Sequence, residues 1–334
     1  MEGLKEEIAA IAMRMGIDKV GFASKESLRD APPSGDMGHI LGSARSAVSL
    51  AVALDKTAIR AFLSKEDQQA HVEDHRQSYI RLRKAEEAIQ KLLVDKGYQA
   101  VGHYPNFDYR KDQPFLTLAP FLSHRYVAVA AGIGWLGWSG NLITPEYGAT
   151  VSLSSVVTSA ELEPDALAEG DICENCRLCA ATCPSHFISQ KDGIIVNIAG
   201  RAYAHNKKAH NLRCLATCGG ANGMGSPEAK WSTWSYKVLD LPAPEGGDEA
   251  FVQSVVEQSK DPANRLLRAT LNAERVEMRG WEGFERFWNT VPLTCGSCML
   301  ICWPNMKDKQ DNYNLLTTSG RVVKTDNGLK VIKG

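Results

Sequence analysis

The sequence predicts an α+β protein in two parts, a body of helices and strands followed by a smaller cysteine-rich part. Apolar residues change between helical and strand spacing through the first 165 residues. All nine cysteines follow residue 172, and an acidic, polar stretch at 161–171 separates the two regions. We therefore place a first domain at 1–165 and a second at 166–310, with a helical insertion at about 219–294 and a tail at 311–334.

The first part contains the following elements in chain order. Apolar residues at positions 4, 8, 11 and 15 predict an opening helix, and a short strand is expected at 19–22. A buried strand at 47–52 precedes a long amphipathic helix through 79–92 that Gly97 ends. A strand at 98–101, a helix at 126–131 and a strand at 150–157 complete the body.

The second part is expected to hold two hairpins and two helices. Lys191-Asp192-Gly193 predicts a turn between apolar pairs at 187–188 and 194–196. Helical spacing covers 248–259 and 262–271. Near the end, Asn327-Gly328 predicts a type I′ turn between strands at 322–323 and 331–332, because both central residues of that turn need positive φ.

Charge and hydropathy give no sign of a charged polymer or a bilayer as partner. The formal net charge is −1, and no run approaches the roughly 18 apolar residues of a membrane span. The first 15 residues form an acidic amphipathic pattern and not an export signal. We expect a cytoplasmic protein without a membrane partner, and a nucleic-acid partner is expected to be unlikely.

The cysteine spacing predicts two [4Fe-4S] clusters. Cys-x-x-Cys-x-x-Cys-x-x-x-Cys-Pro at 173–184 is the bacterial ferredoxin run, whose fourth thiolate ligates the other cluster. A partial second run at 295–302 supplies the missing partners. One cluster is assigned Cys173, Cys176, Cys179 and Cys302; the other is assigned Cys183, Cys295 and Cys298, with Cys214 or Cys218 completing it. Zinc is the alternative, since paired Cys-x-x-Cys motifs also bind that metal.

Such clusters carry single electrons, so the first domain is expected to hold the cofactor that performs the chemistry. Its glycine-rich stretch at 132–140 is a candidate contact, because glycine lets the main chain approach a flat ligand closely. A tight turn with packing glycines explains the same pattern. A flavin or another macrocycle is the alternative cofactor for this domain.

From residue 4 to about 304 the chain resembles the cobalamin-dependent iron–sulfur reductases, the group of epoxyqueuosine reductase and the reductive dehalogenases. The resemblance lies in residues 20–24, 40–48, 131–137 and 142–148 and in the cysteine runs. It implies a nitroreductase-like corrinoid-binding domain followed by a two-[4Fe-4S] ferredoxin-like domain, as in a divergent cytoplasmic member. It also implies that Cys214, in the pair Arg213-Cys214, is the last cluster ligand. Corrinoid (cobalamin) contacts are implied for Gly132, Gly134, Trp135, Gly137, Trp138, Gly140 and Tyr147.

The chain departs from that family near the expected active site. Thr117 stands where epoxyqueuosine reductase has its acidic proton donor, Trp138 stands where a basic residue is common, and no helical-repeat domain for tRNA follows the clusters. Reductive dehalogenases use a tyrosine with a nearby basic residue, so we expect the catalytic group among Tyr104, Tyr109 and Arg110. Two histidines, His103 and His124, flank this segment.

These implications together predict an oxidoreductase that acts reductively on a small organic substrate. Electrons would come from a low-potential donor such as a ferredoxin or flavodoxin. The alternatives are tRNA epoxyqueuosine reduction, reductive dehalogenation, and a non-catalytic electron-transfer or corrinoid-handling protein.

Overall fold

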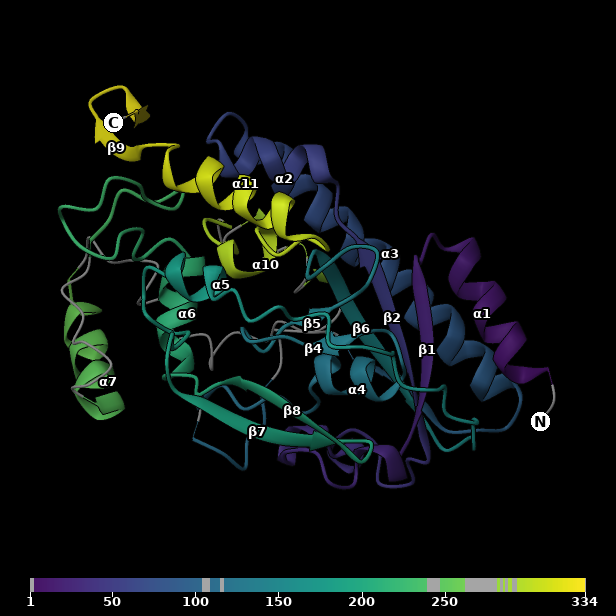
Figure 1. Ribbon diagram of the computed structural model, residues 1–334. Coiled ribbons are helices and arrows are strands. Elements are labelled where there is room, and N and C mark those ends of the chain that lie inside the picture. Colours follow the sequence, from purple (N-terminus) through teal and green to yellow (C-terminus); the bar gives the residue numbers. More distant parts are fainter. Residues whose placement is uncertain are drawn as a thin grey trace.

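The computed structural model describes residues 3–103, 109–114, 117–238, 247–261, 281–282, 285, 288–289 and 293–333. Its body is an antiparallel four-stranded sheet in the order β1-β2-β6-β3 (Figure 1). The strands are β1 (Lys19–Ser24), β2 (Ser46–Ala53), β3 (Ala100–His103) and β6 (Val151–Thr158). The α+β class and the four predicted strands of the body are therefore confirmed.

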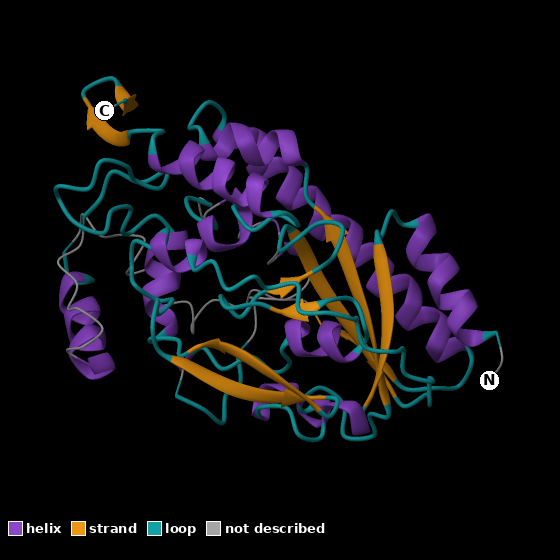
Figure 2. Ribbon diagram, viewed as in Figure 1, coloured by secondary structure: helices purple, strands orange, loops and turns teal. Residues whose placement is uncertain are grey.

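Two helices, α1 (Leu4–Arg14) and α3 (Gln68–Asp95), cover one face of this sheet (Figure 2). The chain enters α3 at Asp67, whose carboxylate accepts a hydrogen bond from the backbone N–H of Ala70 and so caps the helix. Leu82, Ala85, Ile89 and Leu93 recur at helical spacing and are fully buried against the sheet. This layer fixes the outer side of the body.

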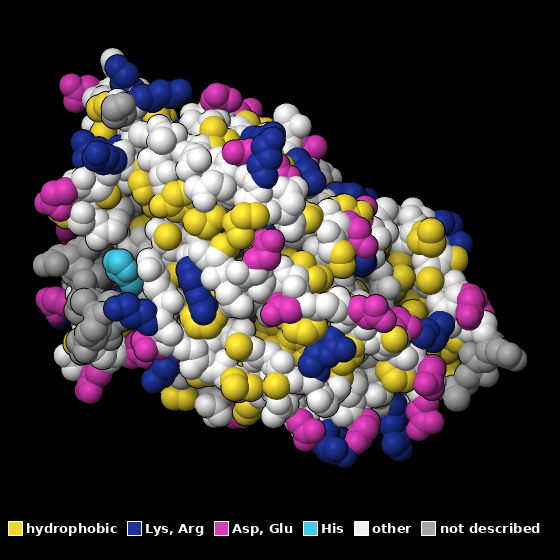
Figure 3. Space-filling model, in the orientation of Figure 1, with side chains coloured by type: hydrophobic (Ala, Val, Ile, Leu, Met, Phe, Trp, Pro, Cys, Tyr) yellow, Lys and Arg dark blue, Asp and Glu magenta, His cyan; other side chains and the backbone are white. Residues whose placement is uncertain are grey.

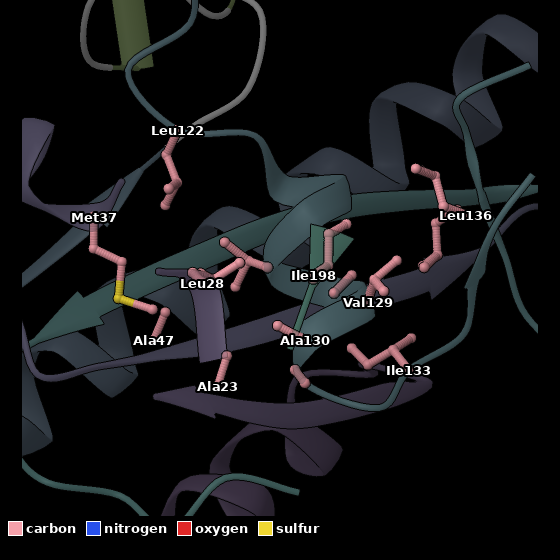
Figure 4. Packing of buried hydrophobic residues seen from close by; sticks show 14 of the residues in the cluster. Ala23, Leu28, Met37, Ala47, Leu122, Val129, Ala130, Ile133, Leu136 and Ile198 are labelled. Atoms are coloured by element: carbon pink, nitrogen blue, oxygen red, sulfur yellow. The ribbon is translucent and has the colours of Figure 1, made fainter. Parts of the chain in front are cut away.

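A short helix, α4 (His124–Ala130), lies on the opposite face of the sheet, and its Val129 and Ala130 pack into the cluster of Figure 4. Side chains alternate along a strand, so β2 turns Val48 and Leu50 toward α3 and the small Ala47 toward α4. The small side chains let α4 approach the sheet closely. The segment after α4 is thereby held at the inner side of the body.

The glycine-rich segment after α4 forms the short pair β4 (Trp135–Leu136) and β5 (Leu142–Ile143). The hairpin β7 (Gly193–Ile198) with β8 (Arg201–Asn206) packs beside them. The predicted turn at Lys191-Asp192-Gly193 is wrong, because the chain reverses at Ala199-Gly200 instead. Both of those residues adopt positive φ, of 50° and 74°.

The cysteine-bearing region contains short helices. They are α5 (Leu178–Ala181), α6 (Asn211–Cys218), α7 (Gly247–Gln258), α10 (Ser297–Leu300) and α11 (Met306–Thr317). α10 and α11 pack on α2 (Lys56–Leu63) of the body, with Trp303 and Leu316 in the shared core. The predicted domain boundary at 310 falls inside α11. The predicted helix at 248–259 is confirmed as α7, whereas the one at 262–271 lies outside the described residues.

The C-terminal hairpin is confirmed as β9 (Arg321–Thr325) and β10 (Gly328–Ile332), but its turn is displaced by one residue. Thr325 pairs with Gly328, so the two central residues are Asp326 and Asn327. Only Gly328 of this turn has positive φ, so the turn is not type I′.

None of the helices in the described ranges is long and apolar enough to cross a bilayer. Acidic and basic side chains are interspersed over the face drawn in Figure 3.

Candidate functional site

Four of the predicted ligands line one small cavity. Cys173, Cys176 and Cys179 come from the segment leading into α5, and Cys302 follows α10. Burial raises the pKa of Cys179 to about 12, and the neighbouring thiols of Cys302, Cys176 and Cys173 raise it further. Thiols more than 120 residues apart are thus neighbours. We call these four residues the first thiol group.

The backbone of this segment explains how closely spaced cysteines face one point. Asn175 and Arg177 both adopt the left-handed conformation, with φ of 50° and 61°. Non-glycine residues enter this region rarely, and each entry reverses the local chain direction. The turn at Arg177 also starts α5, which carries Cys179.

The other thiols gather around Cys298. Burial raises the pKa of Cys298 well above its usual range, with further increases from the thiols of Cys214, Cys183 and Cys295. These four residues are the second thiol group. Cys218 is also present here, because its Sγ lies 3.8 Å from the Sγ of Cys214. The thiol of Cys179, from the first thiol group, also raises the pKa of Cys298, so the two groups lie close together. The division of these cysteines between two clusters stays a prediction.

Residues 138–141 contribute N–H groups to both thiol groups. The backbone N–H of Trp138 donates to Sγ of Cys173 at 3.3 Å, and Nδ2 of Asn141 donates to Sγ of Cys298 at 3.6 Å. Hydrogen bonds to ligand sulfur tune the reduction potential of an iron–sulfur centre. Sequence reasoning did not assign Asn141, whose only signal is its place directly after the glycine-rich stretch.

The donor set fits two clusters. In the part of the chain that the structure describes, no three His, Cys, Asp or Glu side chains converge as ligands of a single ion do. A single zinc ion draws its sulfur ligands to about 2.3 Å from one point. Thiolates of a four-iron cluster each bind a different iron and stand further apart. Two groups of four thiols, each joining distant segments, suit that second arrangement.

Neighbouring protein atoms leave no space for a Cβ at the glycines of the glycine-rich stretch. A Cβ on Gly132 would lie 2.1 Å from the carbonyl oxygen of Ala166, and one on Gly134 would lie 2.3 Å from that of Ile143. Likewise, a Cβ on Gly137 would meet the Ile143 side chain at 2.3 Å, and one on Gly140 would meet Lys208 at 2.7 Å. Close packing within the protein thus requires glycine here, whatever ligand binds.

The three aromatic residues assigned to the corrinoid contact different protein groups. Trp138 is 5% exposed; its Nε1 donates to the carbonyl of Ser189 at 2.8 Å, and the Arg177 guanidinium covers its ring. Trp135 packs edge-on against Tyr203 with ring centres 4.8 Å apart. Tyr147 is half-buried, and burial together with the carboxylates of Asp18 and Glu146 raises its pKa. The side chains of Trp138 and Trp135 therefore contact protein groups.

The predicted catalytic residues face different neighbours. Tyr104 lies outside the described residues. Burial raises the pKa of Tyr109 to about 12, and the nearby thiol of Cys214 adds to the increase, so this phenol borders the second thiol group. The guanidinium of Arg110 pairs with Asp112 and lies 2.8 Å from Nε2 of His39. Tyr109 thus borders the second thiol group, whereas Arg110 lies beside Asp112 and His39.

The two flanking histidines form a stacked pair at the inner sheet face. The rings of His103 and His124 lie 5.2 Å apart, and Nδ1 of His124 lies 2.9 Å from Oγ of Ser155. Nε2 of His124 is buried with no hydrogen-bond partner in the described structure. Burial and the neighbouring His103 and Arg125 lower the pKa of His124 well below its usual range, which keeps the ring neutral.

The site defines a class of protein, an α+β chain with two groups of thiols in ferredoxin-type spacing. No family model matches the chain. Over 217 residues it is 28% identical to the epoxyqueuosine reductase of Bacillus anthracis, covering 57% of this chain and 53% of that protein. A 66-residue segment is 41% identical to the tetrachloroethene reductive dehalogenase of Sulfurospirillum multivorans, covering 19% and 13%. The chain thus spans about half the length of the first of these relatives.

A solved structure of a reductive dehalogenase has the same fold. A variant of the catabolic reductive dehalogenase NpRdhA superposes with a TM-score of 0.52 at 17% identity, covering 98% of this chain and 39% of that one. The chain is therefore similar in sequence to epoxyqueuosine reductases and, over a shorter segment, to a reductive dehalogenase.

The comparisons overturn one expectation. A nucleic-acid partner was predicted to be unlikely, from the near-neutral charge and the missing repeat domain, and that prediction is wrong. The curated relatives include epoxyqueuosine reductases, and one solved epoxyqueuosine reductase structure contains an epoxyqueuosine-modified tRNA-Tyr stem loop. Net charge failed as a guide because it describes the whole chain and not a local surface.

Proposed function

We propose that this chain is an iron–sulfur oxidoreductase that carries two [4Fe-4S] clusters and works with cobalamin. The observation that carries the proposal is the division of eight thiols into two groups. Each group joins cysteines from the first run to cysteines from the second, and one of them surrounds a cavity. This is the cross-ligation that the ferredoxin spacing implies.

In this proposal Cys173, Cys176, Cys179 and Cys302 hold one cluster, and Cys183, Cys214, Cys295 and Cys298 hold the other. Bound clusters of this type supply single electrons at low potential. The protein's own contribution is to shield and position them. Trp138 covers the first site, and its N–H together with the amide of Asn141 donates to ligand sulfur.

We further propose that residues 1–165 form a nitroreductase-like corrinoid and substrate domain and that residues 166–310 form a ferredoxin-like domain. Similarity to the epoxyqueuosine reductases and to a reductive dehalogenase supports this division. The corrinoid has its support in that similarity and not in the glycine-rich stretch, whose glycines are explained by protein packing. Tyr109, which borders the second thiol group, is the described candidate for the proton donor.

The reaction is a reductive cleavage or elimination on an organic substrate, with electrons from a low-potential donor protein. Reduction of an epoxide on a tRNA nucleoside is the second candidate, favoured by the names of the curated relatives. Both use the same two thiol groups and differ only in the substrate that reaches the cofactor.

Metal analysis tests the proposal. Protein reconstituted anaerobically with iron, sulfide and cobalamin is expected to retain about eight iron and one cobalt per chain. Cys176→Ser and Cys298→Ser should each lower the iron content, with the exposed Glu228→Gln as the control. Full iron without retained cobalt would reject the corrinoid, and iron well below four would reject the clusters. Turnover with a halogenated aromatic or with an epoxyqueuosine tRNA stem loop would then separate the two reactions.

A further inference from the structure

Two cations lie beside the second thiol group without a carboxylate partner. They are Arg125, at the start of α4, and Lys208, just after β8. Neither side chain has an Asp or Glu oxygen within 4.0 Å among the described residues, whose ion pairs all involve other cations. Arginine stays charged at every pH that proteins meet. A partly buried positive charge of this kind needs a negative group nearby.

Gly140 connects these cations to the thiols. Nη1 of Arg125 donates to the carbonyl oxygen of Gly140 at 3.0 Å, and Nζ of Lys208 would lie 2.8 Å from a Cβ on that glycine. The next residue, Asn141, donates to Sγ of Cys298. Burial and the neighbouring Arg125 lower the pKa of Lys208 to about 7, and the nearby thiols of Cys214 and Cys298 act in the opposite direction, toward the charged form. Both cations thus lie beside Gly140 and near the second thiol group.

The charges at the first thiol group differ. Lys309 lines the cavity there, but its Nζ lies 2.5 Å from a carboxylate oxygen of Glu174 and is neutralised by it. Arg177 is the remaining cation, stacked on Trp138. One uncompensated positive charge therefore stands at the first group. At the second there are Arg125 and Lys208, joined by the buried Lys65 beside Cys295.

We propose that Arg125 and Lys208 raise the reduction potential of the cluster held by the second thiol group above that of the first. This inference rests on the proposed function. Reduction adds one negative charge to a cluster, so a nearby cation stabilises the reduced form more than the oxidised form. Single electrons that a low-potential donor delivers at the first group then pass downhill to the second.

Redox titration followed by electron paramagnetic resonance tests this on the reconstituted full chain. Arg125→Gln and Lys208→Gln are each expected to shift the ratio of reduced to oxidised second cluster about tenfold toward the oxidised form at fixed potential, equivalent to about 59 mV for one electron. Arg125→Lys should restore the wild-type ratio because it keeps the charge. Lys207→Gln, at an exposed neighbouring position, is the matched control.

Iron content distinguishes failure of the proposed function from failure of the proposed role of the two cations. Wild-type chain that holds no clusters would reject the proposed function itself. Variants that hold about eight iron and titrate like wild type would overturn only the role of the cations. A shift in Lys207→Gln as large as in Lys208→Gln would overturn it too, since the effect would then be one of general surface charge. Two variants are used because Arg125→Gln also removes the bond to Gly140.

Discussion

Cys214 and Cys218 lie one helical turn apart on α6, with their Sγ atoms 3.8 Å apart. This spacing puts both side chains on the same face of the helix, toward the second thiol group. Five thiols therefore meet where a cluster binds four. The sequence left these two cysteines as alternatives, and only the family resemblance favoured Cys214.

We predict that Cys214→Ser loses about half of the iron, whereas Cys218→Ser keeps about eight atoms per chain. The reason is position, since Cys218 lies nearer the end of α6 and its carbonyl is tied to Thr294. Iron analysis and electron paramagnetic resonance spectra of both variants check this prediction. The reverse pattern would make Cys218 the ligand and leave Cys214 as its neighbour.

Trp138 is predicted to be essential for the first thiol group. Its indole is buried, donates to Ser189 and stacks under Arg177. Trp138→Ala should lower the free energy of unfolding by about 3–5 kcal/mol and reduce iron retention, because it opens a cavity beside the cysteines. Trp138→Phe keeps most of the packing and should retain iron. Urea denaturation with iron analysis measures both, and wild-type behaviour of the alanine variant would contradict the role.

The sequence predicted the sheet strands well because strands depend on local pattern. Alternating or continuous apolar residues predicted β2 and β6. The fixed thiol spacing predicts the ligands, and that assignment stays a prediction. The hairpin after the first cysteine run was misplaced because Lys191-Asp192-Gly193 has turn chemistry, yet the chain reverses at Ala199-Gly200. Tertiary packing of Val196 and Ile198 into the body decided that register.

The glycine-rich stretch could not be interpreted from sequence for a different reason. Glycine is needed both where a ligand approaches the main chain and where another part of the protein does. Only the structure shows that Ala166 and Ile143 occupy the space beside Gly132 and Gly134. The proximity of Arg125 and Lys208 could not be predicted from the sequence either, because only folding brings these side chains together.

Gly134→Ala is therefore predicted to destabilise the chain even without any cofactor. The new Cβ would lie 2.3 Å from the carbonyl oxygen of Ile143, and a backbone atom cannot move aside as a flexible side chain does. We expect a loss of about 1–3 kcal/mol in urea denaturation. Gly42→Ala is the matched control, since nothing lies within 4 Å of its Cβ position. Equal stability of the two variants would show that the loop yields and that its glycines serve a ligand instead.

Glu86 gives a pH-dependent prediction. This carboxyl on α3 is 4% exposed, and burial raises its pKa well above its usual range. A group whose pKa is higher in the folded state than in the unfolded state contributes stability at low pH and loses it as the pH rises. Glu86→Gln removes the ionisation. At pH 8 its free energy of unfolding, measured by urea denaturation, should therefore exceed that of wild type by about 1 kcal/mol or more.

The same pair should differ little at pH 4, below the ordinary pKa of a glutamate, where the wild-type carboxyl is mostly protonated in both states. The exposed Glu66→Gln serves as control and should follow wild type at both pH values. A constant difference between Glu86→Gln and wild type from pH 4 to pH 8 would mean that hydrogen bonding of the amide, and not ionisation of the carboxyl, sets the stability of this position.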